Sequence, residues 1–316
     1  MTPEQAHWFA ETFGKLVGNV EQAIVGKTHT IRLAMTTLLS DGHLLLEDVP
    51  GTGKTMLAKA IANTVQGTQN RIQFTPDLLP SDVTGVTIFD QRVGQFEFHK
   101  GPIFATIVLA DEINRASPKT QSALLEVMEE GHVTVDGITH DVPAPFMVIA
   151  TENPIEFHGT YPLPEAQLDR FLVRLAIGYP TAEVEVDILK SHANREPLDS
   201  IEPVMGLDQV RAIQEEVANV HVDDAILEYI VEIVHATRND SRLQLGVSTR
   251  GTLMLSRAAR ARAYALNRAF VIPDDVSWSL PHVLPHRLLL TAKAQHGGAT
   301  AQQIVAEILG RIKVPV

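Results

Sequence analysis

A short glycine-rich segment, EDVPGTGKT at residues 47–55, constrains the fold of this chain more than any other part of its sequence. It follows the apolar run HLLLEDVP, which predicts a short buried strand, and it precedes a predicted helix from Lys54 to about Gln66. A strand, a tight glycine turn and a helix in this order are typical of a phosphate-binding loop, because backbone amides and a helix N-terminus then face the anion.

The residues of this loop have the chemistry that such a site requires. Gly51 and Gly53 permit close approach of the backbone to phosphate, Lys54 supplies a cation, and the Thr55 hydroxyl suits Mg²⁺. The usual pattern G-x-x-x-x-G-K-[ST] requires a glycine where this chain has Asp48. Because Asp48 lies where the strand ends, before the amides turn toward phosphate, we expect that it does not contact the ligand.

Three further apolar runs predict buried strands, namely TIVLADE, FMVIATENP and FLVRLAI, the last at residues 171–177. Buried runs separated by helical segments indicate an α/β fold with a parallel sheet covered on both faces. Two hairpins are predicted between them. VTVDGITHDV places Asp136 and Gly137 between alternating segments, and VTIFDQRVGQFEFHK alternates around Gly94.

Polar side chains follow two of these strands. Asp111 and Glu112 end TIVLADE, and Asn153 lies at the end of FMVIATENP. Open α/β sheets bind ligands at the carboxyl ends of their strands. Asp111 therefore suits a Mg²⁺-associated carboxylate, Glu112 a base or orienter for attacking water, and Asn153 a side chain that holds this water or senses the γ-phosphate.

The second half of the chain predicts helices, and no strand pattern is evident after Tyr179-Pro180. Pro273 suits a first helical turn, and Asp223 is a plausible N-cap for an apolar stripe over residues 226–234. Other helices are expected over 182–193, 207–219, 250–267, 274–280 and 299–312, and a helical period also runs between Asn19 and Ser40. We predict an α/β core over residues 1–178 and an all-helical domain over 179–316.

The composition limits the classes of function. There are 38 acidic and 26 basic residues, a formal charge of −12, which disfavours a protein that grips nucleic acid through its phosphates. There is no cysteine, so disulfides and thiolate zinc sites are excluded. The N-terminus has no apolar signal core, and no apolar run approaches the ~18 residues of a membrane span. We expect a soluble, cytoplasmic protein.

Four segments together resemble the MoxR family of AAA+ ATPases. They are EDVPGTGKT, LADEINRASPKTQSALLEVMEEGHVTVDG, VIATENPIEFHGTYPLPEAQLDRF and LGVSTRGTLMLSRAARARAYAL, and the resemblance runs from residue 24 to residue 290. It implies a P-loop NTPase core, with a parallel sheet flanked by helices and β-hairpin inserts, followed by a C-terminal all-helical lid.

The resemblance also implies roles for single residues. Asp111 and Glu112 match Walker B, with Asp111 and Thr55 holding Mg²⁺, and Asn153 matches sensor 1. Glu152 and Thr249 depart from the glutamine and proline that the family usually has there. Positions that match the nucleotide-binding segments are Val25, Gly26, Pro50, Gly51, Thr52, Gly53, Lys54, Thr55 and Met56.

Two arginines receive catalytic roles from the resemblance. Arg170 matches the arginine that reaches the nucleotide of the neighbouring subunit, and Arg250 matches sensor 2 in the lid. An arginine supplied by a neighbour accelerates phosphoryl transfer by ~10³–10⁵, so the role of Arg170 requires an assembled ring. Arg115 and Arg174 are rival candidates, and an ion pair with Asp169 is the alternative reading of Arg170.

The function implied is a Mg²⁺-dependent ATPase that forms a homo-oligomeric, hexameric ring and remodels protein clients, often partners with a von Willebrand factor A domain. On this hypothesis ATP lies between the core and lid of one subunit, and the hairpins carry motion to the client. The alternatives are a nucleic-acid-dependent AAA+ motor, which the acidic charge disfavours, and a GTPase or small-molecule kinase, for which no N-K-x-D signature is present.

Two other groups of residues carry weaker signals. His282 and His286 have a spacing that could bind a metal, but Pro285 intervenes and position 283 is a valine rather than a glutamate. We interpret the basic stretch with Arg257, Arg260, Arg262 and Arg268 as a solvated, partly ion-paired face rather than a DNA surface.

Overall fold

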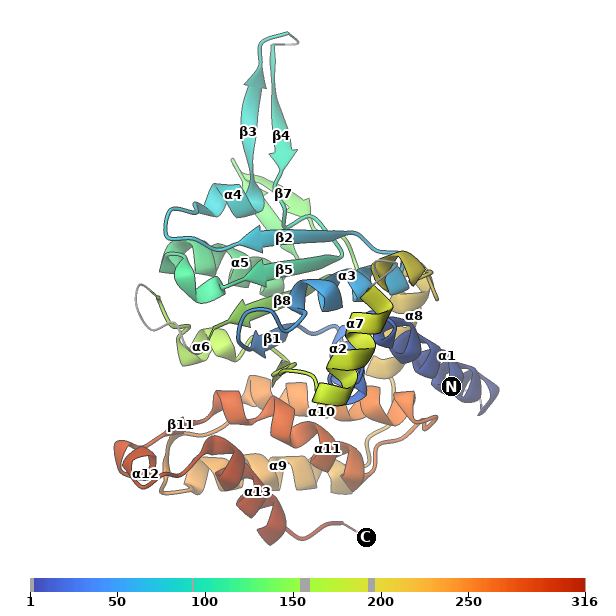
Figure 1. The fold of residues 1–316 in the computed structure, drawn as a ribbon. Coiled ribbons are helices and arrows are strands. Elements are labelled where there is room, and N and C mark those ends of the chain that lie inside the picture. Colours follow the sequence, from blue (N-terminus) through green and yellow to red (C-terminus); the bar gives the residue numbers. More distant parts are fainter. Residues whose placement is uncertain (1–2, 93, 154–159, 193–196, 316) are drawn as a thin grey trace.

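A computed structural model describes residues 3–92, 94–153, 160–192 and 197–315. In these residues a parallel sheet has the strand order β2-β5-β8-β1-β9 and is flanked by helices (Figure 1). Its strands are β1 (Leu44–Glu47), β2 (Gln69–Gln73), β5 (Ile107–Asp111), β8 (Met147–Glu152) and β9 (Val173–Leu175). The predicted α/β fold class is confirmed.

The apolar runs form the middle of this sheet because alternate side chains fill both of its faces. Leu44, Leu46 and Ile149 pack in one hydrophobic cluster with the helices α1–α3, whereas Leu45 and Val148 pack in another with α5. The helices before β9 are α1 (Pro3–Glu21), α2 (Thr28–Leu39), α3 (Lys54–Thr64), α4 (Pro80–Thr84), η1 (Ile113–Arg115), α5 (Pro118–Glu130) and α6 (Glu165–Leu168).

Two features of the core differ from the sequence prediction. The strand β2, with the sequence QNRIQ, was not predicted, because four of its five side chains are polar and it lies at one edge of the described sheet. The helical period between Asn19 and Ser40 falls on two helices, and the break between them was not predicted. Residues 22–27 separate α1 from α2, and Gly26 within them has a φ of 73°.

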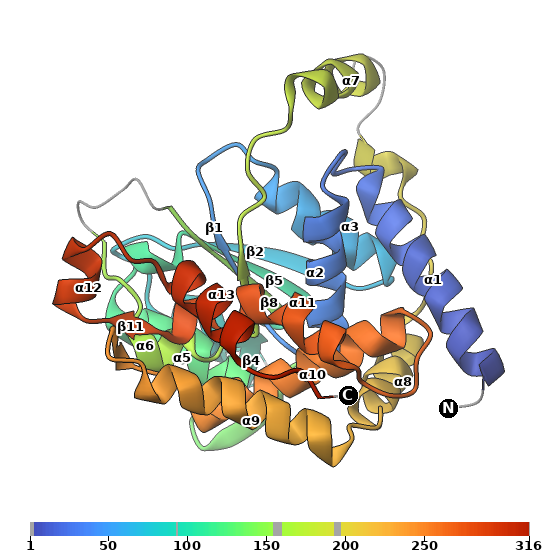
Figure 2. The same cartoon turned by 90° about the horizontal axis from the view of Figure 1, so that it is seen from below.

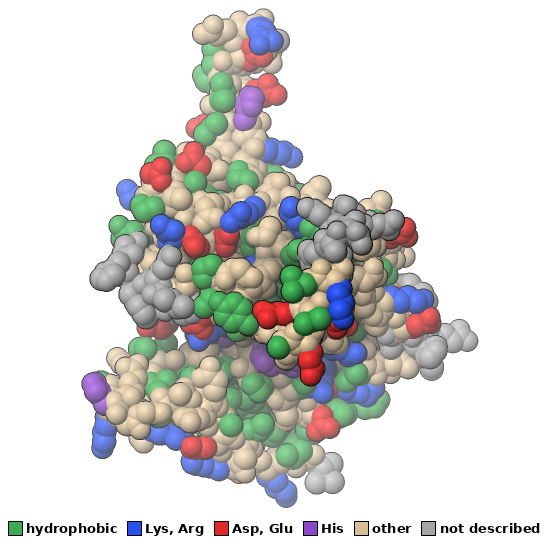
Figure 3. All heavy atoms as spheres, in the orientation of Figure 1, with side chains coloured by type: hydrophobic (Ala, Val, Ile, Leu, Met, Phe, Trp, Pro, Cys, Tyr) green, Lys and Arg blue, Asp and Glu red, His purple; other side chains and the backbone are tan. Residues whose placement is uncertain are grey.

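Both predicted hairpins are present. The strands β3 (Gly85–Asp90) and β4 (Gln95–Lys100) pair in antiparallel fashion, as do β6 (His132–Val135) and β7 (Ile138–Asp141). The β3–β4 hairpin stands away from the body of the molecule (Figure 1). Apolar side chains lie on the surface of this hairpin (Figure 3), and its Phe96 is 75% exposed.

The second half of the chain is mainly helical, as predicted, and Asp223 caps its helix by accepting from the amide of Ala225. One expectation is wrong, because the short strands β10 (Leu243–Leu245) and β11 (Leu289–Leu290) pair here. Residue 193, the expected end of one helix, lies outside the described residues. The helices are α7 (Ala182–His192), η2 (Pro197–Ser200), α8 (Leu207–Ala218), α9 (Asp224–Asn239), α10 (Thr249–Ala265), α11 (Pro273–Val283), η3 (Pro285–Arg287), α12 (Ala292–His296) and α13 (Ala301–Arg311).

The helices after α7 pack directly on the core. Side chains of α8–α11 share one hydrophobic cluster with those of α1–α3. A buried ion pair adds to this contact, since Nε of Arg287 donates to Oδ1 of Asp169 at 2.8 Å, and Arg287 is only 3% exposed. None of the described helices is long and apolar enough to cross a lipid bilayer.

Candidate functional site

The carboxyl edge of the sheet gathers the polar residues that the sequence singled out. The glycine-rich loop follows β1, Asn153 follows β8, and Asp111 is the last residue of β5 and is followed by Glu112. The order β5-β8-β1 makes these three strands neighbours, so Asn153 lies between the loop and the two acids. Ligands of open α/β sheets bind at this edge, which makes it the candidate site.

The backbone of the loop explains its glycines. Gly51 and Gly53 have φ angles of 84° and 90°, a left-handed conformation that side chains with a Cβ rarely adopt. A Cβ on Gly51 would meet no atom within 4 Å, so open space lies beside it. Gly53 is the N-cap of α3, and Thr55 and Met56 lie in the first turn, where the positive end of the helix favours an anion.

Lys54 folds back over this loop. Its Nζ donates to the carbonyl oxygens of Asp48 at 2.9 Å and of Val49 at 3.3 Å. The Thr52 hydroxyl also donates to the Val49 oxygen, at 3.3 Å. These bonds hold the ammonium group against the backbone at the start of the loop.

The Asp48 carboxylate is turned away from the loop amides and joins two parts of the core. Its Oδ2 accepts from the amides of Ile177 at 2.7 Å and Gly178 at 2.8 Å, and its Oδ1 accepts from the amide of Val49 at 2.9 Å. Asp48 is only 6% exposed. The residue that replaces the usual glycine thus ties the end of β1 to the segment that leads from β9 into α7.

Replacing Asp48 with asparagine should lower the apparent Tm by several degrees. Asparagine keeps the shape but turns an NH₂ group toward amide donors, and a buried unmatched donor costs about 1–3 kcal/mol. Differential scanning fluorimetry measures this. Asp48→Gly restores the usual loop pattern and should also destabilise the chain without tightening nucleotide binding. An Asp48→Gly chain as stable as the parent would contradict the anchoring role.

Asp111 has a defined set of partners. Its Oδ1 accepts from the Thr151 hydroxyl at 2.7 Å, and its Oδ2 accepts from Nε and Nη2 of Arg71 at 3.1 and 2.5 Å. Asp111 is 9% exposed, so these bonds hold its carboxylate at the carboxyl edge. Mg²⁺ prefers oxygen ligands. The fixed Asp111 carboxylate and the Thr55 hydroxyl are therefore suitable ligands for one Mg²⁺ ion at this edge.

Glu112 has an unusual backbone with a φ of 56°. Its amide donates to the Thr151 hydroxyl at 2.8 Å, which holds this conformation. Its Oε2 accepts from Nε2 of Gln73 at 2.9 Å and from Nη1 of Arg115 at 3.0 Å. Left-handed backbone outside glycine concentrates at functional sites, and here it directs a carboxylate along the edge of the sheet.

Asn153 is buried beside a group of charges. Glu152 lies opposite Glu47 in the register of β8 and β1, and Nη2 of Arg174 lies 2.7 Å from Oε2 of Glu47. Burial, and then the charge of Glu47, raise the pKa of Glu152 to about 7, against the opposing charge of Arg174. Glu152 is therefore partly protonated near neutral pH, so it adds less negative charge beside Asn153 than an ordinary glutamate.

Replacing Glu152 with glutamine should stabilise the chain more at pH 8 than at pH 5. A raised pKa means that the folded state binds more protons than the unfolded state between pH 4.5 and pH 7, so stability falls as pH rises through this window. Glutamine stays neutral, and its advantage should grow by on the order of 2 kcal/mol between pH 5 and pH 8. Thermal unfolding of both chains at the two pH values tests this, and an equal gain at both would contradict it.

Arg170 and Arg250 lie together at the opposite, amino edge of the sheet. Glu129 holds both, because Arg170 Nε donates to its Oε2 at 2.9 Å and Arg250 donates to its Oε1. The hydrogen bond from Arg170 and the charge of Arg250 lower the pKa of Glu129. Strands of four to six residues are roughly 13–20 Å long. About the length of a strand therefore separates these arginines, at the amino ends of the strands, from Lys54 at the carboxyl ends.

This position corrects one hypothesis. The sequence placed ATP between the core and lid of one subunit, with Arg250 near it, but Arg250 lies beside Arg170 rather than beside the loop of its own chain. The reason is that the lid docks through Asp169 and Arg287 at the start of β9. The rival arginines stay at the loop's own edge, where Arg115 pairs with Glu112 and Arg174 pairs with Glu47.

The segment with Val25 and Gly26 lies against α7. A Cβ on Gly26 would come within 3.0 Å of Cγ2 of Val184, and Nζ of Lys27 donates to the Tyr179 oxygen at 2.9 Å. Ile24 Cδ1 lies 3.5 Å from a Cβ built on Gly53. The segment is thus close to the loop, where it suits an adenine contact.

Sequence reasoning missed four side chains that organise these groups. Arg71 and Gln73 belong to the unpredicted strand β2, Thr151 reads as an ordinary strand residue, and Glu129 has no local pattern that marks it. No local pattern in QNRIQ marks the first two residues, because the pairing of β2 with the acid-bearing strand β5 is seen only in the fold.

The residues discounted in the sequence have separate structural partners. Nε2 of His282 lies 3.2 Å from Nε2 of His29, whereas Nε2 of His286 lies 3.0 Å from the carbonyl oxygen of Phe171. Within the described part of the chain, no group of three or more potential ligands converges on a metal position. Arg262 and Arg268 both pair with Asp275.

Comparison with known proteins agrees with this geometry. Residues 43–173 match the family model described as "ATPase family associated with various cellular activities (AAA)", and residues 235–308 match the AAA lid domain. The uncharacterized protein YeaC of Bacillus subtilis is 53% identical over 96% of this chain and 95% of its own length.

Two further relatives support the same assignment. Chaperone MoxR1 of Mycobacterium tuberculosis is 41% identical over 96% of this chain and 82% of its own length. A crystal structure from Cytophaga hutchinsonii has a TM-score of 0.92 at 36% identity, and the match covers 99% of this chain and 98% of the other.

Proposed function

The chain belongs to the MoxR family of AAA+ ATPases, and from this premise we propose that it hydrolyses ATP with Mg²⁺ in a cytoplasmic hexameric ring of identical copies and uses the energy to remodel protein clients. The core would comprise residues 1–178 and the lid residues 179–316. The observation that carries the proposal is the convergence of the loop, Asn153, Asp111 and Glu112 on one edge of the sheet.

Each group at this edge has a role in the proposal. The loop amides and Lys54 bind the phosphates, and Thr55 and Asp111 hold Mg²⁺, which supplies charge neutralisation of the triphosphate when bound. Glu112 orients and deprotonates the attacking water, and Asn153 holds this water against the γ-phosphate. Val25 and Gly26 contact the base.

The arginines motivate the ring. Arg170 and Arg250 lie about the length of a strand from the loop of their own chain. The Glu129 carboxylate forms an ion pair with each of these two arginines. A neighbouring copy that presents its loop to this edge would complete a site with two guanidinium groups. We therefore assign both arginines to the nucleotide of the adjacent copy.

The β3–β4 hairpin supports client contact. It stands away from the ATPase body (Figure 1), and Phe89 and Phe96 pack against each other with ring centroids 5.1 Å apart while both stay exposed. Exposed aromatic side chains on a protruding element suit contact with an apolar protein segment. One relative is named a chaperone, and a protein with a von Willebrand factor A domain is the client class we propose. The formal charge of −12 disfavours the alternative function, a nucleic-acid-dependent motor.

Replacing Lys54 with alanine tests nucleotide binding. The charge-assisted bonds of one ammonium group contribute about 1.5–3 kcal/mol, so ATP affinity should fall about 10- to 100-fold and hydrolysis should be lost. Titration with a fluorescent ATP analogue and phosphate release measure the two effects. Lys59→Ala is the matched control, because Lys59 lies exposed on the same helix. Unchanged affinity in the Lys54 variant would remove the loop from its role.

A further inference from the structure

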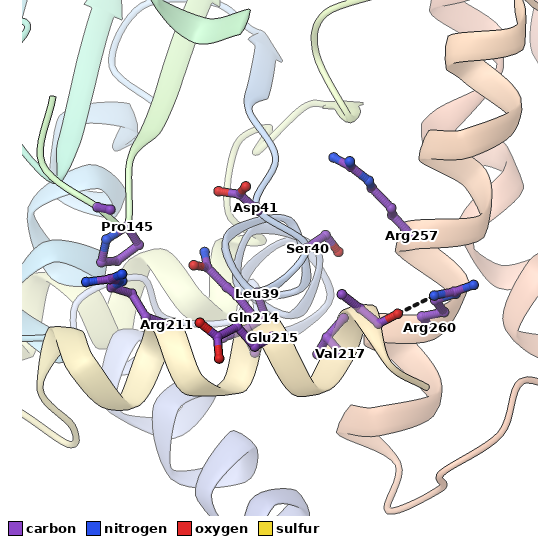
Figure 4. A pocket seen from close by; sticks show the side chains of 12 residues that line it. Leu39, Ser40, Asp41, Pro145, Arg211, Gln214, Glu215, Val217, Arg257 and Arg260 are labelled. Carbon is purple, nitrogen blue, oxygen red and sulfur yellow. Dashed lines mark hydrogen bonds between the residues drawn. The ribbon is translucent and has the colours of Figure 1, made fainter. Parts of the chain in front are cut away.

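A cavity of about 510 Å³ lies between the core and the lid at the amino edge of the sheet. Its apolar part is formed by Leu39, Pro145 and Val217, and Arg211, Arg257 and Arg260 project around it from α8 and α10 (Figure 4). We call this cavity the arginine groove. It is an apolar floor surrounded by cationic side chains, together with the acids Asp41 and Glu215.

Two of these arginines form no ion pair within the described residues. Arg260 donates to the Ala218 oxygen, whereas Arg211 and Arg257 are exposed and form no ion pair with any residue in the described ranges. Figure 4 shows Arg257 extending from α10 into the space between lid and core. An acidic partner would therefore find two guanidinium groups here that form no ion pair within the described residues, although Asp41 and Glu215 line the same groove.

The arginine groove continues into the cavity that holds Arg170 and Arg250. This second cavity has a volume of about 350 Å³ and shares Asp41 and Arg257 with the groove. Arg250 and Arg257 are seven residues apart on α10, which places them on one face of the helix. A copy that brings its nucleotide to Arg170 and Arg250 thus also brings neighbouring surface to the groove.

The helix α7 has the complementary chemistry and lies beside the nucleotide loop. Val184 contacts Gly26 and is only half-buried, and the opposite face presents Val186 and Leu189, which are 49% and 73% exposed. Glu183 and Glu185 flank this apolar face by helical geometry, and neither forms an ion pair with a described residue. Figure 2 shows α7 standing apart from the other helices, on the far side of the molecule from α8 and α9. Hydrophobic, acidic and basic side chains lie together over its position in Figure 3.

We propose that the arginine groove of one copy receives α7 of the adjacent copy, with Val186 and Leu189 on the apolar floor and Glu183 and Glu185 against Arg211 and Arg257. This inference rests on the proposed ring, because it uses the same edge-to-edge association that brings Arg170 to a neighbour's nucleotide. The contact would make α7, which follows the Asp48-anchored segment, part of the joint between copies.

Cross-linking tests the contact directly, since the natural chain contains no cysteine. One chain carries Val186→Cys and a second carries Glu215→Cys, at the edge of the groove. Mixed with ATP and a mild oxidant, the two should form a disulfide-linked dimer, which can arise only between copies. Leu227→Cys on α9, exposed and outside the groove, replaces Glu215→Cys in the control and should give only background.

Charge reversal provides a second measurement. Glu183→Arg with Glu185→Arg should weaken ATP-dependent assembly by at least 10-fold, as should Arg211→Glu with Arg257→Glu, and all four changes in one chain should restore it. If the copies assemble and Arg170 acts on a neighbour's nucleotide, but neither the cross-link nor the charge rescue is observed, the contact between α7 and the groove is wrong and the ring is not. A chain that never assembles overturns the ring and the contact together.

Discussion

Replacing Glu112 with glutamine should slow ATP hydrolysis by about 10²–10⁴-fold, the usual contribution of a general base, while ATP affinity changes little. The reason is geometric. Glu112 is held along the edge by Gln73 and Arg115, whereas Lys54 and the loop amides bind phosphate independently of it. Both hydrogen bonds go to the same oxygen of Glu112, so the amide oxygen of glutamine can accept both of them, but the amide cannot accept the proton of the attacking water.

Single-turnover phosphate release and equilibrium binding measure the two quantities separately. Glu126→Gln is the matched control, because Glu126 is exposed on α5 and makes no ion pair in the described residues. The Glu112 variant should keep ATP bound and the ring assembled, which also makes it the chain of choice for capturing a client. Turnover within a few-fold of the parent chain would remove Glu112 from the catalytic step.

Replacing Arg170 with alanine should lower hydrolysis by about 10³-fold or more in the assembled state and leave nucleotide binding intact. The loop of each chain keeps its own contacts, so the loss should appear only when a neighbour's arginine is required. Arg311→Ala on α13 is the control, since this arginine is exposed and pairs only at the surface with Glu307.

Mixing two inactive chains decides where Arg170 acts. Chains with Arg170→Ala keep an intact loop, and chains with Lys54→Ala keep an intact arginine. In random rings about a quarter of the interfaces then combine the two intact halves, so activity should recover to about a quarter of the parent value. A mixture that stays inactive while it co-assembles would show that Arg170 serves its own chain or none.

The central part of the site was predictable because its signals are local. Each of the strands β1, β5 and β8 is an apolar run that ends in polar residues, so chain order and sheet geometry place Asp111, Glu112 and Asn153 near the loop. The hairpins were predictable for the same reason, since Gly94 and Gly137 mark their turns.

The rest of the site depends on contacts between distant residues, which a single sequence does not reveal. The strand β2 is polar because it lies at the edge, so its Arg71 and Gln73 could not be connected with Asp111 and Glu112. The place of Arg250 depends on how the lid docks, and the buried pair of Asp169 and Arg287 joins residues 118 positions apart. No periodicity predicts such a pair.

The separation of the loop from Arg170 and Arg250 has a consequence for counting active centres. Under the proposed function each copy carries half of a centre on each of two opposite edges, so association is head-to-tail. A closed assembly then has as many complete centres as chains, whereas an open one always leaves one loop and one arginine pair unmatched at its ends. Activity per chain would therefore report ring closure, rising with concentration and levelling off when the last gap is filled.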